Sequence, residues 1–418
     1  MSKISVEKIY NFILSIIMCI ILFSGSSVFA SYRYLFIAIC AGVVFIANAI
    51  KNEGKFKLFL KPIYNRILLI IIVILTLNVP FSYNIKSSIK YITFFTIIYV
   101  TSLSLFENEN FFKRLIKAIL VSSMILAFSI LLCAVFGNYI EKYFSFLLPK
   151  SVASLRVFRD ELRRGAYSGF AFERSYAATG LTLGISIIFS NIVVDKKIKK
   201  SEIVALVILL VALFCTGKRM LLLINMFTFL FVFFINGKKE NLVKFLKLSV
   251  ILSIFLIIIL IYVPQTRRVF VRFLDKQGPN TIEARNENYW VYCLEMFSER
   301  PIAGYGINSF VDYITSKNVR EIFNAHNIYF QLLAETGIIG LSIFLILFGY
   351  LLIFTYKKLK EFKNDEYKSK LINISLLLQI IFLIYGLSGN TLYYFAQVFI
   401  YFIAIMIVNN LSFNKEED

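Results

Sequence analysis

Long apolar segments alternate with short polar segments along the whole chain. Twelve of them have about the length, roughly 20 residues, that an α-helix needs to cross the hydrocarbon core of a bilayer. Because backbone polar groups in lipid must pair within the segment, each is predicted to be helical. The predicted spans cover about residues 9–30, 34–50, 67–81, 90–106, 115–137, 175–194, 203–216, 220–236, 248–263, 338–355, 371–389 and 391–408. The pattern predicts an all-α polytopic membrane protein in which residues 1–418 form a single integral membrane domain.

Composition agrees with this class. Hydrophobic residues make up 59% of the chain and charged residues 17%, whereas a typical soluble domain is roughly half apolar and about a quarter charged. The net charge of +20 does not indicate nucleic-acid binding, because most lysines lie in short loops that the positive-inside rule places in the cytoplasm, facing lipid headgroups. Four of the five cysteines lie within predicted spans, so no disulfide framework is expected.

Two longer polar segments interrupt the alternation, at residues 138–174 and 265–337. With twelve spans and both termini in the cytoplasm, both become outer loops, and the larger lies between the ninth and tenth spans. On this topology 23 of 30 lysines are cytoplasmic, but 13 of 15 arginines are outside. Because arginine binds phosphate through two parallel hydrogen bonds, this surface indicates a phosphorylated ligand. The alternative is that the arginines of long loops are simply solvated.

The larger loop contains the only histidine of the chain, His326, near the start of an apolar-periodic segment at 324–337. Asn324 is a suitable N-cap, and Gly337 suits the position after the last helical turn. His326 would then lie in the first turn, where the positive end of the helix dipole disfavours an imidazolium. A neutral imidazole can accept a proton, as a general base must, although a lone histidine can equally be structural.

A second helix is predicted at 285–299 in the same loop. Trp290, Leu294 and Phe297 share one face, which indicates an amphipathic helix at the outer membrane surface with Trp290 as its interfacial anchor. A helix that simply packs in the protein is the alternative. Arg285 lies on another face of this helix.

Motifs that bind metals or nucleotides are absent from the sequence. It contains no D-x-D pair, no H-E-x-x-H, no Walker A loop and no Cys/His cluster. The aspartates are scattered, so no carboxylate set is evident that would hold Mg²⁺ against a phosphate. If a diphosphate leaves in the reaction, arginines must stabilise its charge. We therefore expect neither a metal nor a cofactor.

Three sequence motifs resemble those of the O-antigen ligase and polysaccharide polymerase superfamily. In the larger loop, Arg285 is followed by ERPIAGYG at 299–306, AHNIY at 325–329 and ETGIIG at 335–340, in the order of that family's arginine, P-x-x-G-x-G turn and H-N…E-x-G segment. TGKR at 216–219 and the R-x-G entry at 163–176 resemble two earlier family motifs. Lys218 departs from the small polar residue often found there. The resemblance covers residues 163–340, and the twelve-span topology extends it over the chain.

The resemblance implies a GT-C-like, metal-independent glycosyltransferase of the bacterial cytoplasmic membrane that uses glycan linked to undecaprenyl diphosphate. It implies that His326 deprotonates the acceptor hydroxyl and that Arg219 and Arg285 grip the donor diphosphate. Arg164 and Arg174 are implied as further diphosphate contacts. A chain-length regulator and a flippase of the same pathway are the implied protein partners.

Family members divide by acceptor. A repeat-unit polymerase, for capsule, exopolysaccharide or O-antigen, is the first interpretation, with the 265–337 loop as its outward-facing catalytic loop. A ligase that transfers glycan to lipid A core or another terminal acceptor is the alternative, because the motifs serve both. A lipid flippase or transporter is disfavoured, because the prolines lie in loops or near span ends and ionisable residues are scarce within the spans.

Overall fold

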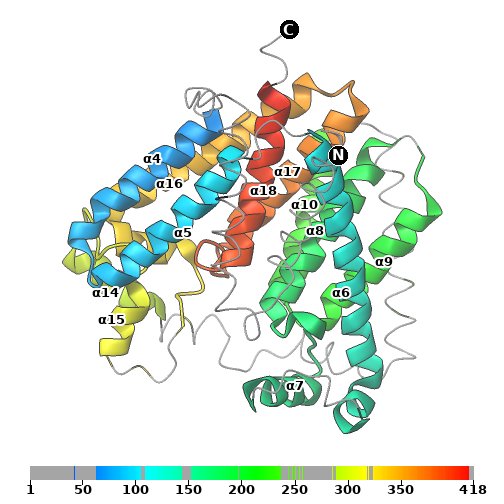
Figure 1. Cartoon of the computed structure of the whole chain (residues 1–418), viewed down its shortest axis with the longest axis horizontal. Coiled ribbons are helices and arrows are strands. Elements are labelled where there is room, and N and C mark those ends of the chain that lie inside the picture. Colours follow the sequence, from blue (N-terminus) through cyan, green and yellow to red (C-terminus); the bar gives the residue numbers. More distant parts are fainter. Residues whose placement is uncertain are drawn as a thin grey trace, which may run out of the picture. The chain divides into compact units, whose positions relative to one another are not determined.

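The computed structural model describes residues 63–104, 109–143, 152–195, 197–236, 289–317 and 323–413, with Arg285 and a few other single positions. Every regular element in these ranges is a helix, which confirms the all-α prediction. The chain divides into two compact units (Figure 1). The first comprises Met1–Leu35, Glu109–Asp275 and Phe362–Ile381, and the second comprises Phe36–Asn108, Lys276–Glu361 and Phe382–Asp418. The single membrane domain stays a prediction.

Nine of the twelve predicted spans coincide with helices in the described part. These helices are α4 (Ile63–Asn78) with η1 (Val79–Phe81), α5 (Ile85–Ser104), α6 (Glu109–Tyr143), α8 (Arg174–Val194), α9 (Lys200–Cys215), α10 (Arg219–Asn236), α16 (Ile328–Glu361), α17 (Glu366–Tyr385) and α18 (Phe395–Phe413). Among the described residues, five helical segments are long and apolar enough to cross a membrane: Ile63–Phe81, Phe112–Tyr143, Arg174–Val194, Ile328–Glu361 and Glu366–Tyr385. The predicted spans at 9–30, 34–50 and 248–263 lie largely outside the described residues. The count of twelve spans and the placement of the loops between them therefore stay predictions.

The first unit is built around α8, whose side chains are almost all buried. It packs against α6, α9 and α10. Small residues let α6 and α8 approach closely, since Ser123 Oγ donates to Gly180 O at 2.9 Å and a Cβ on Gly184 would lie 2.5 Å from Ser123 Cβ. Phe189 of α8 stacks on Phe229 of α10 with ring centroids 4.0 Å apart. The short helix α7 (Val152–Arg164) and the 3₁₀ turn η3 (Gly169–Ala171) connect α6 to α8.

In the second unit, α4 contacts α5, α16 and α18. Polar side chains link these helices: Tyr64 and Thr355 share a hydrogen bond of 2.7 Å between their hydroxyls, and Asn409 Nδ2 donates to Asn65 Oδ1 at 3.0 Å. All four side chains are buried. These bonds satisfy polar groups that would otherwise be unpaired among apolar helices.

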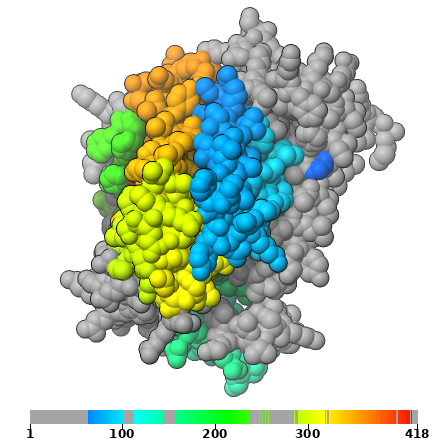
Figure 2. All heavy atoms as spheres, turned by 90° about the vertical axis from the view of Figure 1, so that its left-hand side faces the viewer, coloured from blue at the N-terminus to red at the C-terminus, as the bar shows by residue number. Residues whose placement is uncertain are grey.

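The second unit has an apolar outer face formed by α4 and α16. Figure 2 shows α4 in blue beside α16 in orange, with the yellow-green segment near residues 289–316 at the end of the pair. Both helices expose apolar side chains, namely Leu69, Ile70, Val73 and Leu77 of α4 and Ile338, Ile339, Ile346 and Ile353 of α16. Contact with lipid explains an apolar surface that runs along membrane-length helices.

The helix α16 is interrupted at Gly337, whose φ of 64° and ψ of −171° are not helical. The turn at 301–306 fills this break. Tyr305 N donates to Ala334 O at 3.1 Å, Gly306 N donates to Glu335 O at 2.7 Å, and Ile338 N donates to Pro301 O at 2.9 Å. The turn thus supplies partners for backbone groups that the interruption frees. The prediction of a helix end at Gly337 is confirmed.

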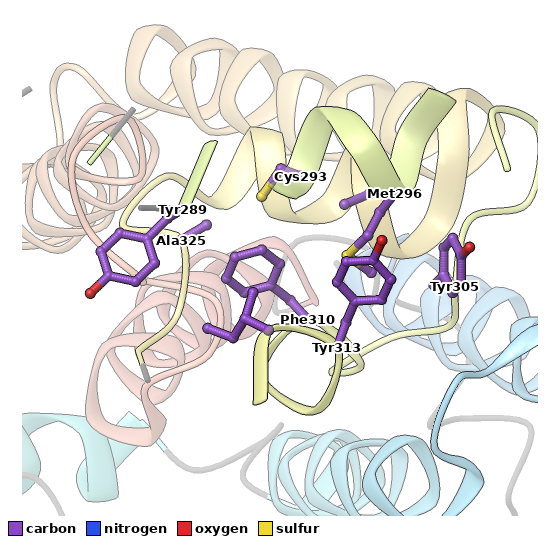
Figure 3. Close-up of a cluster of buried hydrophobic side chains, with 9 residues drawn as sticks. Tyr289, Cys293, Met296, Tyr305, Phe310, Tyr313 and Ala325 are labelled. Atoms are coloured by element: carbon purple, nitrogen blue, oxygen red, sulfur yellow. The ribbon is translucent and has the colours of Figure 1, made fainter. Parts of the chain in front are cut away.

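Two short helices precede α16, namely α14 (Val291–Glu299) and α15 (Phe310–Ser316). They enclose a buried cluster that includes Tyr289, Cys293, Met296, Phe310 and Tyr313 (Figure 3).

The positions of α14 that are buried in the protein are Cys293 and Met296, whereas Leu294, on the predicted apolar face, is 46% exposed. Contact of that face with the membrane surface stays a prediction. Trp290 packs against Phe330, with ring centroids 5.4 Å apart, and its Nε1 donates to Ala325 O at 2.9 Å. Trp290 therefore packs within the protein, as in the alternative interpretation of this helix.

Loops that the predicted topology assigns to one side lie together within each unit. In the second unit, Tyr83 N, from the α4–α5 turn, donates to Tyr305 O at 2.6 Å, and Ile328 N donates to Gly386 O at 2.9 Å. In the first unit, Lys370 forms an ion pair with Asp195, which joins two loops predicted to be cytoplasmic. The contacts agree with the predicted alternation of spans, and the assignment of the two sides stays a prediction.

Candidate active site

His326 lies just before α16, in a backbone conformation that is unusual for a non-glycine residue. Its φ is 56°, in the left-handed region, and such conformations persist where surrounding contacts hold them. The neighbouring residues supply these contacts. Ala325 N donates to Gln331 Oε1 at 3.1 Å, and Ile328 N donates to Gly386 O at 2.9 Å.

The predicted cap of this helix is corrected by the structure. Asn327, not Asn324, is the cap, because Asn327 Oδ1 accepts from Tyr329 N at 3.0 Å and Phe330 N at 3.2 Å. The helix therefore begins at Ile328, and His326 precedes it instead of lying in its first turn. Both asparagines are suitable N-cap residues by type. Which of them caps the helix depends on where the backbone becomes helical, and the sequence alone does not show this.

Asn390 binds His326 at two points. His326 N donates to Asn390 Oδ1 at 2.7 Å, and Asn390 Nδ2 lies 3.2 Å from His326 Nδ1. Asn390 itself is 1% exposed. The ring of Tyr289 packs against the imidazole edge to face at 5.9 Å. Sequence reasoning missed Asn390, whose only signal was a polar S-G-N-T turn between two apolar segments.

Arg285 contacts the same turn. Its Nη1 donates to Ser388 O at 3.0 Å, and its buried Nε has no hydrogen-bond partner among the described residues. Burial lowers the pKa of Arg285, opposed by the nearby Tyr385 and Tyr289. Two predicted site residues that are 41 positions apart, His326 and Arg285, are thus both bound to the segment 386–390.

Glu335 is a buried carboxylate that fastens the surrounding loop to α16. Its Oε2 accepts from Asn308 N at 2.7 Å and from the Tyr393 hydroxyl at 2.7 Å. Its Oε1 accepts from Phe310 N at 3.0 Å and from Gln331 Nε2 at 3.0 Å. A carboxylate with donors on both oxygens satisfies the requirement for pairing buried charge. The acidic residue of the E-x-G motif therefore has a structural explanation.

The other three predicted arginines lie in the first unit. Arg164 ends α7 and forms an ion pair with Asp160 at 2.7 Å, a residue that also pairs with Arg163. Arg174 and Arg219 are the first residues of α8 and α10. Arg174 interacts electrostatically with the buried Glu161.

Two sequence motifs meet in this unit. Tyr167 N, just after α7, donates to Cys215 O at 3.0 Å, at the start of the turn that leads to Arg219. A Cβ on Gly217 would lie 3.1 Å from Ala166 Cβ, so the two turns are in close contact. Glu161 Oε2 accepts from Ser168 N and Oγ at 3.0 and 2.9 Å, and burial raises the pKa of Glu161 to about 7.

The five predicted residues therefore form two groups. His326 and Arg285 belong to the second unit, and Arg164, Arg174 and Arg219 belong to the first. Their union in one site stays a prediction. The described residues contain no group of three or more His, Cys, Asp or Glu side chains arranged to hold a metal, and a metal-free reaction likewise stays a prediction.

Comparison with known proteins identifies one family. Residues 204–345 match the family model described as O-antigen ligase. The matched range contains Arg219, Arg285 and His326, and it excludes Arg164 and Arg174. No curated protein matches the chain. The resemblance inferred from the motifs is confirmed.

Proposed function

We propose that this chain, which matches the O-antigen ligase family model over residues 204–345, is a polymerase of glycan repeat units. It transfers a growing glycan from undecaprenyl diphosphate to a lipid-linked repeat unit at the outer face of the bacterial cytoplasmic membrane. The family match, the membrane-length helices and the arginine-bearing motifs support this proposal.

The observation that carries the proposal is the joint attachment of Arg285 and His326 to the 386–390 turn. The turn binds Arg285, whose buried Nε has no hydrogen-bond partner among the described residues, and it also accepts the backbone N–H of His326. A half-buried guanidinium suits an anionic oxygen, since charge-assisted hydrogen bonds strengthen where water is excluded. The donor diphosphate supplies such oxygens.

The placement of Arg174 and Arg219 supports the same ligand. Each is the first residue of a long helix, where the positive end of the helix dipole is unfavourable for the positive charge of the arginine unless an anion is bound there. Backbone N–H groups and an arginine at one helix end together suit a bound anion. We propose that these arginines also bind the diphosphate, with Arg164 beside them.

In the proposed reaction, a hydroxyl of the acceptor sugar attacks the anomeric carbon of the donor. The new glycosidic C–O bond forms as the bond to the diphosphate breaks, and the hydroxyl loses its proton. Undecaprenyl diphosphate leaves with the electrons of the broken bond. The arginines stabilise its charge, so that no metal or cofactor is required. A chain-length regulator and a flippase of the same pathway are the proposed protein partners.

The ligase is the second candidate, because the matching family model is described as O-antigen ligase. The two functions differ only in the acceptor, which is lipid A core or another terminal acceptor for a ligase. The family match also favours glycan transfer over the transport of lipid-linked oligosaccharide.

One reconstitution separates these functions. Purified protein in lipid vesicles receives only the lipid-linked repeat unit extracted from a strain that lacks this protein. A polymerase builds a ladder of lipid-linked oligomers from this single substrate. A ligase builds none until a terminal acceptor is added. Absence of transfer to every acceptor would reject both.

A further inference from the structure

Asn390 has one permitted amide orientation. The backbone N–H of His326, 2.7 Å from the Asn390 side chain, can only donate, so the atom that faces it must be the amide oxygen. The other end of the amide, 3.2 Å from His326 Nδ1, is then the NH₂ group. Because Asn390 is 1% exposed, bulk water does not compete for these contacts.

The amide orientation determines which imidazole nitrogen carries the proton. An NH₂ group can only donate, so His326 Nδ1 must present its lone pair to it. A proton on Nδ1 would instead point at the amide hydrogens. We infer that His326 is held by Asn390 as the neutral imidazole protonated at Nε2, and that it serves the proposed glycan transfer as a hydrogen-bond donor to the donor diphosphate.

This role differs from that of a general base working through Nε2. Such a base needs its lone pair at Nε2, with the proton on Nδ1 facing an acceptor, as the Asp of a Ser-His-Asp triad provides. Asn390 presents the opposite group. An Nε2–H is suited to an anionic oxygen, the same ligand that we propose for Arg285 on the adjacent part of the turn.

The acceptor hydroxyl does not need a strong base in this arrangement. Glycosyl transfer passes through a transition state in which the anomeric carbon resembles an oxocarbenium ion. The attacking hydroxyl becomes strongly acidic once its bond to that carbon has largely formed. Its proton then passes to a phosphate oxygen of the leaving diphosphate or to water, which balances the reaction without a change in the protonation of His326.

The backbone around His326 keeps the imidazole in place. Its positive φ turns the chain so that its N–H points at Asn390. Asn390 is held in turn because its own carbonyl accepts from Tyr393 N at 2.9 Å and Tyr394 N at 3.0 Å. Asn390 is thus a positioning residue: it acts through His326 and sets its tautomer.

The only histidine of the chain makes the tautomer directly measurable. Full-length protein purified without a histidine tag and carrying ¹⁵N-imidazole histidine has a single pair of ring signals. We expect, at neutral pH, an unprotonated (pyridine-type) Nδ1 and a protonated (pyrrole-type) Nε2. The reverse pattern, or two protonated nitrogens, would overturn the assignment.

Asn390→Asp provides the decisive variant. Both carboxylate oxygens accept, so the variant keeps the bond from His326 N but draws the ring proton to Nδ1. Asn327→Asp is the matched control, because it adds the same charge next to His326 on an oxygen that caps α16. Fluorescence of Trp290, the only tryptophan, checks that the local fold is kept in both, since its indole is bonded to Ala325.

We expect Asn390→Asp to exchange the two nitrogen signals and to lower the rate of transfer from the lipid-linked repeat unit by at least about tenfold. Asn327→Asp should leave the signals unexchanged. An Asn390→Asp protein with exchanged signals and an undiminished rate would overturn the donor role, because it would show that a lone pair at Nε2 serves the reaction. If wild type has the expected tautomer but transfers no glycan, the tautomer stands and the proposed function fails.

Discussion

Tyr305 N donates to Ala334 O at 3.1 Å, and Ala334 O is the acceptor that Ile338 N would use in an unbroken α-helix. Ile338 N donates instead to Pro301 O at 2.9 Å. Tyr305 N therefore takes the acceptor that Ile338 N would use, and Pro301 O accepts from Ile338 N in its place. The turn at 301–306 thus replaces one hydrogen bond of the helix with two of its own. These two hydrogen bonds attach the loop that contains the candidate site to the membrane-length helix α16.

Gly337→Ala should strongly destabilise the protein. Its φ and ψ lie in a region that is essentially confined to glycine, and a Cβ there would lie 2.2 Å from Ile302 O. We expect a loss of about 2 kcal/mol or more, seen as a lower melting temperature in detergent. Gly349→Ala in the same helix is the control and should be neutral, because, apart from the adjacent helix backbone, no atom of the described residues lies within 4 Å of its Cβ position. Equal melting temperatures for the two variants would contradict the close approach.

Arg285→Lys and Arg219→Lys should lose nearly as much transfer activity as the alanine variants. A lysine ammonium cannot reproduce the planar fork that binds two oxygens together. Loss of one such contact to developing charge lowers rates by about 100-fold. Arg163→Lys, at an exposed residue paired with Asp160, should keep wild-type activity. Lysine variants as active as wild type would show that charge alone suffices.

Stability should fall as pH rises through the range in which Glu161 titrates. Burial raises its pKa from 4.5 to about 7, so the folded protein binds this proton more tightly than the unfolded chain does. The proton therefore stabilises the fold below about pH 4.5, and this contribution is lost between there and pH 7. One pKa unit corresponds to about 1.4 kcal/mol.

Melting temperatures of wild type and Glu161→Gln, measured from pH 5 to pH 8, test this expectation. The variant should show a flatter profile, by about 2 kcal/mol across the range. Asp160→Asn is the matched control, because hydrogen bonds and charge from Arg163 and Arg164 lower the pKa of Asp160 from an ordinary value that already lies below that range. Parallel profiles for wild type and Glu161→Gln would exclude the proposed titration.

Transfer activity should persist in EDTA, since arginines are proposed to stabilise the leaving diphosphate. The measurement compares initial rates before and after dialysis against the chelator. Activity that is lost and then restored by Mg²⁺ or Mn²⁺ alone would refute the metal-free reaction.

The sequence predicted the elements better than the contacts between them. Apolar segment length located nine helices of the described part, because burial in lipid constrains length directly. The apolar face of this helix was predicted from the spacing of Trp290, Leu294 and Phe297. The structure instead buries Cys293 and Met296, because they face the cluster around Phe310. Helical periodicity alone could not separate faces that differ by one residue.

Contacts distant in the sequence explain what was missed at the site. Asn390 lies 64 residues after His326, and nothing near the histidine indicates it. Arg285, His326 and the glycines at 304 and 306 were recognisable because a single segment contains them. The attachment of Arg285 and His326 to the 386–390 turn depends on contacts between segments that are far apart in the sequence, which local patterns do not encode.

The exchange at Gly337 also has a consequence for how freely this loop can vary. The atoms that join residues 301–306 to α16 belong to the main chain, as does Ala303 O, which accepts from Asn78 Nδ2 at 2.8 Å. Ile302 is 64% exposed. The side chains at positions 302 and 303 therefore take no part in the hydrogen bonds that attach the loop to α16. The side chains can vary at these positions without loosening the attachment of the loop to the membrane-length helix.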